Sequence, residues 1–443
     1  MWEIFDEFFY AWAAPLMLIL FLGAFVTMML VLGFDPSPIL SITVALTPIW
    51  LPLALFYVTF ERWLEFVFLK FEMGQGRVTL RIKLPQEVTK SPEAMEYVLA
   101  QIHNVQSPDN YWQTYIDGKH PLVNSFELVS IRGEVRFYAN VPRKKTKNAL
   151  EAQLYAQYPG IEVVEEEIDY TAAVPYDPQR FDMMAFHMRK KKPDVYPIKT
   201  YIDCGLDKMP KEEEKIDPMA PMLEHLGKVQ STEMLWIQIL AVPHVDRGLK
   251  RGSLTYQPTW EGRVKAEIDK IMNRDPETKG STLEINEQPR LTTGERDTVT
   301  AMERNVDKYA YECAIRWMYI CDKGKFNGDI INPTLRSFSA YDVQRRNGIG
   351  FAWRTDFDYN WFADPTGSRV KEYKRQELDY YKRREFWQRD YRKNMDRMYV
   401  MSVEELATMF HIPGSTVVTP TLSRIMSTRK EAPPNLPVGT PPQ

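Results

Sequence analysis

The sequence predicts an α+β protein that begins with a two-helix transmembrane hairpin, continues as ferredoxin-like (split βαβ) cytosolic units and ends in C-terminal helices. Three observations predict this class. The first sixty residues contain no lysine or arginine, the next hundred alternate between strand-like and helix-like apolar periodicity, and residues 371–397 show a charged, aromatic helical pattern. The predicted domains are a hairpin with a helical extension (1–73), a first ferredoxin-like domain (74–169), a second α+β domain (196–370), a helical segment (371–427) and a proline-rich tail (428–443).

Two uncharged runs, residues 8–34 and 36–60, predict the hairpin. A helix that crosses a bilayer needs about 20 apolar residues, because its backbone must satisfy its own hydrogen bonds there. Both runs are long enough, and the alternative is a pair of buried helices in a soluble protein. Prolines between the runs predict a tight turn, and Pro48 and Pro52 predict a kink in the second helix.

Basic residues predict the orientation of this hairpin. Arg62, Lys70 and Arg77 follow the second run, whereas no basic residue precedes the first. The positive-inside bias places the C-terminal side in the cytoplasm, and two crossings place the N-terminus there as well. We therefore expect a two-pass protein of the inner (plasma) membrane, with the lipid bilayer as a partner.

The remaining residues, 61–443, are electrically balanced. They hold all 56 basic residues and 55 of the 59 acidic ones, which argues against nucleic acid as a partner reached by bulk charge. Three cysteines form no C-x-x-C pair, and six histidines show no metal-ligand spacing. We therefore expect neither a metal nor a cofactor.

The first soluble unit shows the clearest periodicity. Residues 78–84 alternate between apolar and polar, as a half-buried strand does, and an amphipathic helix begins after Ser91. A hairpin is predicted around Arg132 and Gly133, followed by a helix at 147–158 and a strand at 161–166. The resulting order β-α-β-β-α-β is that of a ferredoxin-like unit.

The second unit is predicted to follow a mostly irregular stretch, residues 170–197. Its expected strands are residues 198–204, 234–242, 314–321 and 350–353, and its expected helices are residues 217–226, 263–274, 293–306 and 332–339. This order resembles the first unit with an insertion, which predicts a degenerate internal repeat. Ser402 is predicted to cap the last helix.

Motifs for catalysis are mostly missing from the sequence. It contains no G-x-x-x-x-G-K-[ST] loop, no G-x-S-x-G and no dinucleotide fingerprint. Cys204 with His225 could form a nucleophile–base pair, but a strand-end cysteine and a helix histidine are favoured. The acidic runs 165–167 and 212–214 are interpreted as solvated faces, because adjacent carboxylates on a strand point in different directions. We therefore predict no catalytic residue and no enzymatic activity.

Basic clusters offer candidate contacts. Residues 371–397 interleave ten basic and six acidic residues with aromatic rings, a pattern that can bind nucleic acid, although the acids also permit i,i+4 pairing. The clusters 143–145 and 189–192 are interpreted as anionic-headgroup contacts or ordinary surface loops. The candidate residues for nucleic acid or lipid are Arg143, Lys144, Lys145, Lys190, Lys191, Arg383, Arg384 and Arg389.

A series of stretches resembles a known group of bacterial membrane proteins. These stretches are LRIKLPQEVTKSPEAMEYVL, FELVSIRGEVRFYANVPRK, EAQLYAQYPGIEV, YPIKTYIDCGLDK, DPMAPMLEHLG, WIQILAVPH and VEELATMFHIPG. They are similar to the membrane-anchored N-terminal region of type IV secretion (conjugation-type) ATPases of the HerA–FtsK superfamily. The resemblance runs from about Pro36 to Pro437.

The resemblance implies a function without carrying over a catalytic residue. In longer chains of this group, a segment like residues 432–437 leads into a P-loop motor, whereas this chain stops at Gln443. We therefore expect a membrane-anchored, non-enzymatic scaffold that docks a HerA–FtsK-type ATPase on a separate chain, and a homo-oligomer by analogy with such motors. The alternatives are a membrane-bound DNA-handling adaptor that uses residues 371–397, and an enzyme with an unrecognised site.

Overall fold

The computed structural model describes parts of residues 21–35 and residues 37–86, 88, 90–104, 110–208, 216–245, 259–272, 291–356, 367–385, 398–414 and 424–425. The chain divides into two compact units. One contains residues 1–74, 108–119 and 358–373, and the other contains residues 75–107, 120–357 and 374–443.

The first unit is helical. Its helices are α2 (Ser37–Ala45), α3 (Thr47–Gln75) and the short α5 (Tyr111–Tyr115). The segment that carries α5 is attached to α3, because the Trp63 indole donates a hydrogen bond of 2.8 Å to the carbonyl oxygen of Tyr115. The rings of Phe60 and Tyr115 also lie 5.7 Å apart.

The structure corrects the prediction of a transmembrane hairpin. None of the helices in the described residues has both the length and the apolar composition that a membrane crossing requires. The second uncharged run is divided between α2, which has nine residues, and residues 47–60 of α3, so neither part supplies about 20 apolar residues. Most of the first run lies outside the described residues. The predicted hairpin, and the two-pass inner-membrane location inferred from it, are therefore wrong.

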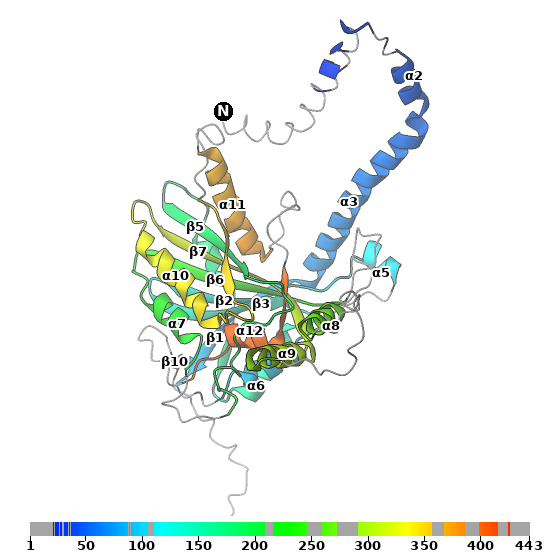
Figure 1. Ribbon diagram of the computed structural model, residues 1–443. Coiled ribbons are helices and arrows are strands. Elements are labelled where there is room, and N and C mark those ends of the chain that lie inside the picture. The colour runs from blue at the N-terminus through cyan, green and yellow to red at the C-terminus, as the bar shows by residue number, and fades with distance from the viewer. Residues whose placement is uncertain are drawn as a thin grey trace, which may run out of the picture. The chain divides into compact units, whose positions relative to one another are not determined.

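The second unit is built on an antiparallel sheet of nine strands within the described residues. They are β1 (Arg77–Pro85), β2 (Asn124–Ile131), β3 (Glu134–Pro142), β4 (Glu162–Glu166), β5 (Phe181–Lys190), β6 (Glu233–Pro243), β7 (Ala310–Asp322), β8 (Ile349–Arg354) and β9 (Tyr399–Ser402). The strand order is β4-β1-β3-β2-β6-β7-β5-β8, with β9 beside β7. Figure 1 shows the part of this order that runs from β1 to β5. A short strand, β10 (Arg424–Ile425), pairs in parallel with the end of β1.

The first half of the sheet has split βαβ topology. With α4 (Glu93–Gln101) and α6 (Lys147–Gln157), its elements follow β-α-β-β-α-β and its strands lie in the order β4-β1-β3-β2. Arg132 and Gly133 form the β2–β3 turn with φ of 55° and 88°, and two positive φ values are what a type I′ hairpin requires. A Cβ at Gly133 would lie 2.8 Å from the carbonyl oxygen of Val229, so glycine is also needed for the close approach.

The second half has the same order of elements. With α7 (Ala220–Gly227) and α10 (Ile331–Ser337), its strands lie in the order β6-β7-β5-β8. Helices α8 (Trp260–Ile271) and α9 (Thr293–Val306) form an insertion between β6 and β7. The two halves join where β2 pairs with β6, so they share one continuous sheet.

The position of β5 differs from the prediction. Residues 170–197 were expected to be irregular, but they contain a 3-10 turn, η1 (Tyr170–Ala173), and β5. Strand β5 is buried on both faces, so its sequence lacks the alternation that reveals a half-buried strand. The strand expected at 198–204 is instead a turn, closed by a 2.9 Å hydrogen bond from the Thr200 amide to the Asp203 carboxylate.

The two faces of the sheet carry different cores. The larger core lies on the face covered by α4, α6, α7, α10 and α12 (Val403–Met409). It contains buried apolar residues of α4, α6, α7 and α12, and Ile331 and Leu335 of α10 pack against it. The opposite face carries a smaller cluster that includes Trp236 and Met318, and α11 (Ser368–Arg383) packs there through Leu378 and Tyr381. The remaining short turns are η3 (Gly328–Ile330) and η4 (Phe338–Tyr341).

Candidate functional site

Four polar side chains lie opposite one another across the strands on the α11 face. Glu127 on β2 pairs with Gln238 on β6, Gln238 with Arg316 on β7, and Arg316 with His187 on β5. Directly opposed residues of antiparallel strands project from the same face, so these side chains are neighbours. All four are buried, and we call them the polar row.

The basic end of the polar row binds an acidic residue of α11. Glu377 places its Oε2 atom 2.9 Å from Nε2 of His187 and 3.8 Å from Nη1 of Arg316. Arg316 also donates a 2.7 Å hydrogen bond to the carbonyl oxygen of Tyr380 and lies over the ring of Tyr381, 5.2 Å from its centroid. The guanidinium of Arg316 is therefore satisfied by α11.

The acidic end binds a basic residue that directly follows α11. Arg384 donates from Nε to Oε1 of Glu127 at 3.0 Å, and its Nη2 lies 2.7 Å from the Asp169 carboxylate. Glu127 also accepts hydrogen bonds from the hydroxyls of Ser125 (2.6 Å) and Tyr170 (2.7 Å). The helix thus presents an acid to the basic end of the row and a base to the acidic end.

The middle of the row is closed by Gln238. Its Nε2 donates to Glu127 at 2.9 Å, and its Oε1 accepts from Nε of Arg316 at 2.7 Å. An amide can donate and accept at the same time, so Gln238 links the two ends without adding a charge.

Electrostatics keep both carboxylates of this site ionised. Burial opposes ionisation of Glu127, but the charge of Arg384 and its hydrogen bonds hold the pKa of Glu127 below its usual range. Burial likewise opposes ionisation of Glu377, and His187 and Arg316 hold its pKa low. Burial raises the pKa of the Tyr381 phenol far above its usual value. The two carboxylates are therefore ion-paired, and the arrangement joins α11 and Arg384 to strands β2, β5 and β7.

The predicted contact residues fall into three groups. Arg143, Lys144, Lys145, Lys191 and Arg383 are exposed, Lys190 and Arg384 are buried, and Arg389 lies outside the described residues. Arg143 pairs with Glu165, and Lys191 pairs with Asp342. The Lys190 ammonium lies 2.7 Å from the Glu405 carboxylate, with both side chains at most 1 % exposed. Lys190 and Arg384 therefore bind the protein itself in this structure, and neither can reach a nucleic acid or a headgroup.

Cys204 and His225 have separate surroundings. His225 lies 2.7 Å from the hydroxyl of Thr334 and 3.1 Å from the carbonyl oxygen of Ile330, and burial lowers the pKa of its imidazole. Burial raises the pKa of the Cys204 thiol, which disfavours the thiolate that a nucleophile requires. Of the acidic runs, Glu165 pairs with basic side chains, whereas residues 212–214 lie outside the described residues.

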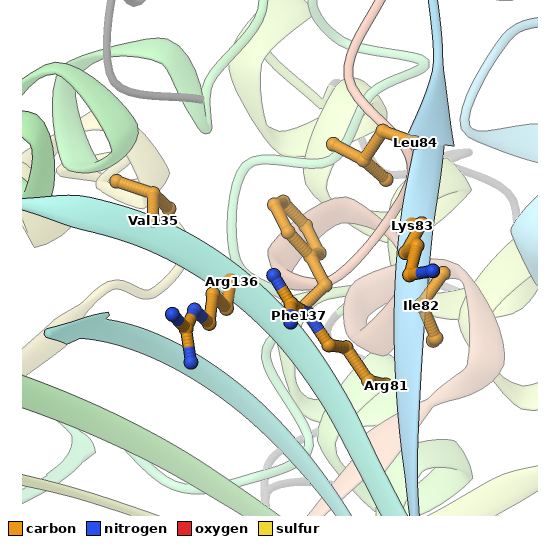
Figure 2. Close-up of a pocket in the computed structure, with 7 residues that line it drawn as sticks. All are labelled: Arg81, Ile82, Lys83, Leu84, Val135, Arg136 and Phe137. Carbon is orange, nitrogen blue, oxygen red and sulfur yellow. The ribbon is translucent and has the colours of Figure 1, made fainter. Parts of the chain in front are cut away.

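A small hollow lies between β1 and β3, lined by residues 81–84 and 135–137, which Figure 2 shows as sticks. Its volume is about 10 Å³. That volume holds at most one water molecule, whereas sites for small molecules usually measure about 300 Å³ or more. The described residues also contain no group of His, Cys, Asp and Glu side chains that could hold a metal ion.

A second set of buried ion pairs fixes residues 398–412, which we call the C-terminal strap. Its strand β9 pairs with β7, and every residue of its helix α12 is buried. Ser402 caps α12 as predicted, in a reciprocal capping box with Glu405. Glu404 binds Arg304 and Lys308 of the insertion at 3.0 and 2.9 Å.

The strap ends in a buried histidine. His411 Nδ1 lies 3.0 Å from the carbonyl oxygen of Ala407, and its Nε2 lies 3.1 Å from the Asp217 carboxylate. Both partner atoms only accept hydrogen bonds, so both ring nitrogens donate and the imidazole carries a proton on each. Burial opposes this charge, but Asp217 raises the pKa of His411 above its usual value.

The analysis of motifs missed the polar row. Its signal is a single charged or amide residue within each of several apolar strands: Glu127 in FELVSI, Gln238 in WIQIL and Arg316 in AIRWMY. This pattern indicates a buried polar group that needs a partner, but it does not identify the partner.

Comparison with known proteins places most of the chain in one family. No curated protein and no solved structure matches the chain. The family described as "Domain of unknown function (DUF8128)" matches residues 68–424, which include both halves of the sheet, α11 and the C-terminal strap. The chain therefore belongs to the DUF8128 family.

Proposed function

We propose that this protein is a non-enzymatic assembly component of a type IV secretion-like or conjugation-like machine, in which it docks a HerA–FtsK-type ATPase supplied by another chain. The observation that carries the proposal is the C-terminal strap. Residues 399–412 of the strap are buried and are held by ion pairs, and a segment of this kind is a firm attachment point for the chain that follows it.

The strap is connected to both halves of the sheet. Lys308 joins Glu404 of the strap to Glu96 on α4 of the first half, with ion-pair distances of 2.9 and 2.7 Å. The ring of Phe410 lies 5.1 Å from that of Phe126 on β2, and Asp217 binds His411 ahead of α7 in the second half. A load applied beyond the strap is therefore shared by the whole sheet.

The sequence that follows favours a docking role. Residues 431–443 contain five prolines, a composition typical of extended segments that partners recognise. The resemblance to the N-terminal region of conjugation-type ATPases supports an ATPase as that partner. The ion-paired state of the buried carboxylates, and the raised pKa of the buried thiols, support a structural role for these groups.

The test is affinity capture of the full-length chain from its own cells, with chemical cross-linking and mass spectrometry. We expect cross-links between residues 428–443 and an ATPase of the HerA–FtsK type. The test variant replaces Pro433, Pro434 and Pro437 with alanine. Compared with the wild-type chain, it should recover less of the ATPase while keeping the same thermal midpoint of unfolding. Captures that contain no such ATPase, or variants that recover it equally well, would contradict the proposal.

A further inference from the structure

We propose that the first half of α3, residues 47–60, inserts into the acyl layer of a lipid bilayer, and that the aromatic rings around α5 lie at the level of the headgroups. The inference concerns the helical unit alone and does not depend on the ATPase. It involves no membrane crossing, since these residues span only about 21 Å as a helix, whereas the hydrocarbon core measures about 30 Å.

The side chains described in this half of α3 are mostly apolar and exposed. Ile49, Leu53 and Phe56 are 63, 64 and 63 % exposed, and Leu51 and Leu55 are exposed as well. Soluble monomers rarely leave an apolar surface of this kind in water, because its hydration is costly. The surface is therefore an interaction site.

The exposed apolar side chains lie on opposite sides of the helix. With about 3.6 residues per turn, Ile49, Leu53 and Phe56 share one side of α3, whereas Leu51 and Leu55 lie on the other. A groove in a protein partner covers one side of a helix. An acyl layer contacts every side, so a lipid bilayer covers this surface more completely than one protein partner does.

The distribution of charge along α3 complements the layers of a bilayer. Residues 36–60 contain no charged residue, and charge begins with Glu61 and Arg62. An acyl layer excludes charged side chains because it cannot solvate them, whereas the headgroup layer accepts them. The hydroxyl of Thr59 donates to the carbonyl oxygen of Leu55 at 2.7 Å, so this polar group is satisfied without water. The boundary between the two layers therefore falls near residue 60.

Aromatic rings gather at this boundary. The ring of Phe60 lies 5.7 Å from that of Tyr115, which lies 6.2 Å from the ring of Tyr111. Tyr111 and Trp112 of α5 are 77 and 69 % exposed. The rings of Tyr and Trp have an apolar body and a polar tip, so they collect at the headgroup level of bilayers. We call these four residues, together with Trp63, the aromatic belt.

The aromatic belt is fixed to α3. The indole of Trp63 donates its hydrogen bond to the carbonyl oxygen of Tyr115. Gly118, with a φ of 69°, follows α5 so close to α3 that a Cβ there would clash with the carbonyl oxygen of Val67. The belt therefore sets how deeply residues 47–60 enter the bilayer.

The test is flotation of the full-length chain with vesicles of phosphatidylcholine, which carries no net charge. We expect the chain to float with the vesicles equally well in low and high salt, because salt does not screen apolar insertion. Leu53→Glu should lower the partition coefficient about tenfold or more, because it places a charge in the acyl layer. The matched control, Ile168→Glu, makes the same kind of change at a residue of the sheet unit that is 75 % exposed, and it should float like the wild-type chain.

A fluorescent label separates insertion from other contacts. In a Cys204→Ser chain, whose other two cysteines are buried, an NBD label on Phe56→Cys should shift to blue emission and lose access to a water-soluble quencher when vesicles are added. The same label on Ile168→Cys should not change. A wild-type chain that stays with the soluble fraction, that salt releases from the vesicles, or whose label at position 56 stays open to the quencher would overturn the proposal. Soluble oligomers that bury this label without vesicles would overturn it in favour of a protein partner.

Discussion

On one face of the sheet, helices α4, α6, α7, α10 and α12 bury aliphatic and aromatic side chains, whereas on the other α11 meets a row of charged and polar groups. Adjacent residues of one strand show the contrast. Phe126 of β2 points into the apolar core beside Phe410, and Glu127 points to Arg384. The first kind of contact depends on buried area and shape, and the second depends on charge and on exact partners. The apolar face therefore supplies stability, and the charged face supplies selectivity for α11.

The largest expected effect is on the apolar face. Phe126→Ala should lower the free energy of unfolding by about 3–5 kcal/mol, because it leaves a cavity in a fully buried site that cannot be hydrated. Urea-induced unfolding followed by circular dichroism measures the change. A loss below about 1 kcal/mol would mean that this face is not the main source of stability.

The neighbouring substitution on the charged face should cost less. Glu127→Ala removes the acceptor of Arg384, Gln238 and Tyr170, and we expect the free energy of unfolding to fall by about 1–3 kcal/mol because Asp169 still pairs with Arg384. The double variant with Arg384→Met should recover part of the loss in the same urea experiment, since it removes the unpaired charge. A loss larger than that of Phe126→Ala would reverse the ranking of the two faces.

A smaller, pH-dependent effect is expected at His411 of the C-terminal strap. The pKa of His411 is raised in the folded protein. Its protonated imidazole therefore stabilises the fold fully below the unfolded-state pKa near 6.5, and this stabilisation is lost as the pH rises through the folded-state pKa. Burial opposes ionisation of Asp217, but His411 lowers the pKa of this carboxyl. Asp217 therefore stabilises the fold fully above its unfolded-state pKa, and this stabilisation is lost as the pH falls through its folded-state pKa. The stability difference between the wild-type chain and His411→Gln should therefore shrink from pH 6 to pH 9. A difference that stays constant over this range would contradict the assigned protonation.

The smallest effect is expected for an exposed pair on the surface of α7. Lys228 and Glu224 form an i,i+4 ion pair of 3.0 Å with side chains 69 % and 52 % exposed. Lys228→Ala should change the free energy of unfolding by less than about 0.5 kcal/mol, because water and salt screen the pair. Thermal unfolding of both chains at low and high salt measures this change. A change larger than about 0.5 kcal/mol would contradict the expectation that solvent screens the pair.

Local signals made much of the fold predictable. The helix predicted at 293–306 is α9, whose cap and first turn are readable as Thr292 with Glu295. The hairpin predicted at Arg132 and Gly133 is also present. Both depend on neighbours in sequence. The strand β5 was missed because burial on both faces removes the alternation that reveals a strand, and the transmembrane hairpin was predicted from length and composition alone, without the break between α2 and α3.

The candidate site shows the same limit. Lys190, Arg383, Arg384 and Lys191 look alike as basic residues in charged stretches, and sequence patterning treated them as one class of surface contact. The structure buries the first and the third as partners of Glu405 and Glu127, which are 215 and 257 positions away in the chain. No local pattern can distinguish a solvated base from a base whose acid lies so far away.

The sequence by itself determined the capped helices, the hairpin turn and the presence of single polar residues inside apolar strands, because these depend on backbone preferences and on side chains only a few positions apart. The tertiary structure alone decided that Glu127, Gln238, Arg316 and His187 stand in one row, and that α11 supplies the charges that complete it. The physical reason is strand register: a shift of one residue in any pairing would turn a member of the row to the opposite face.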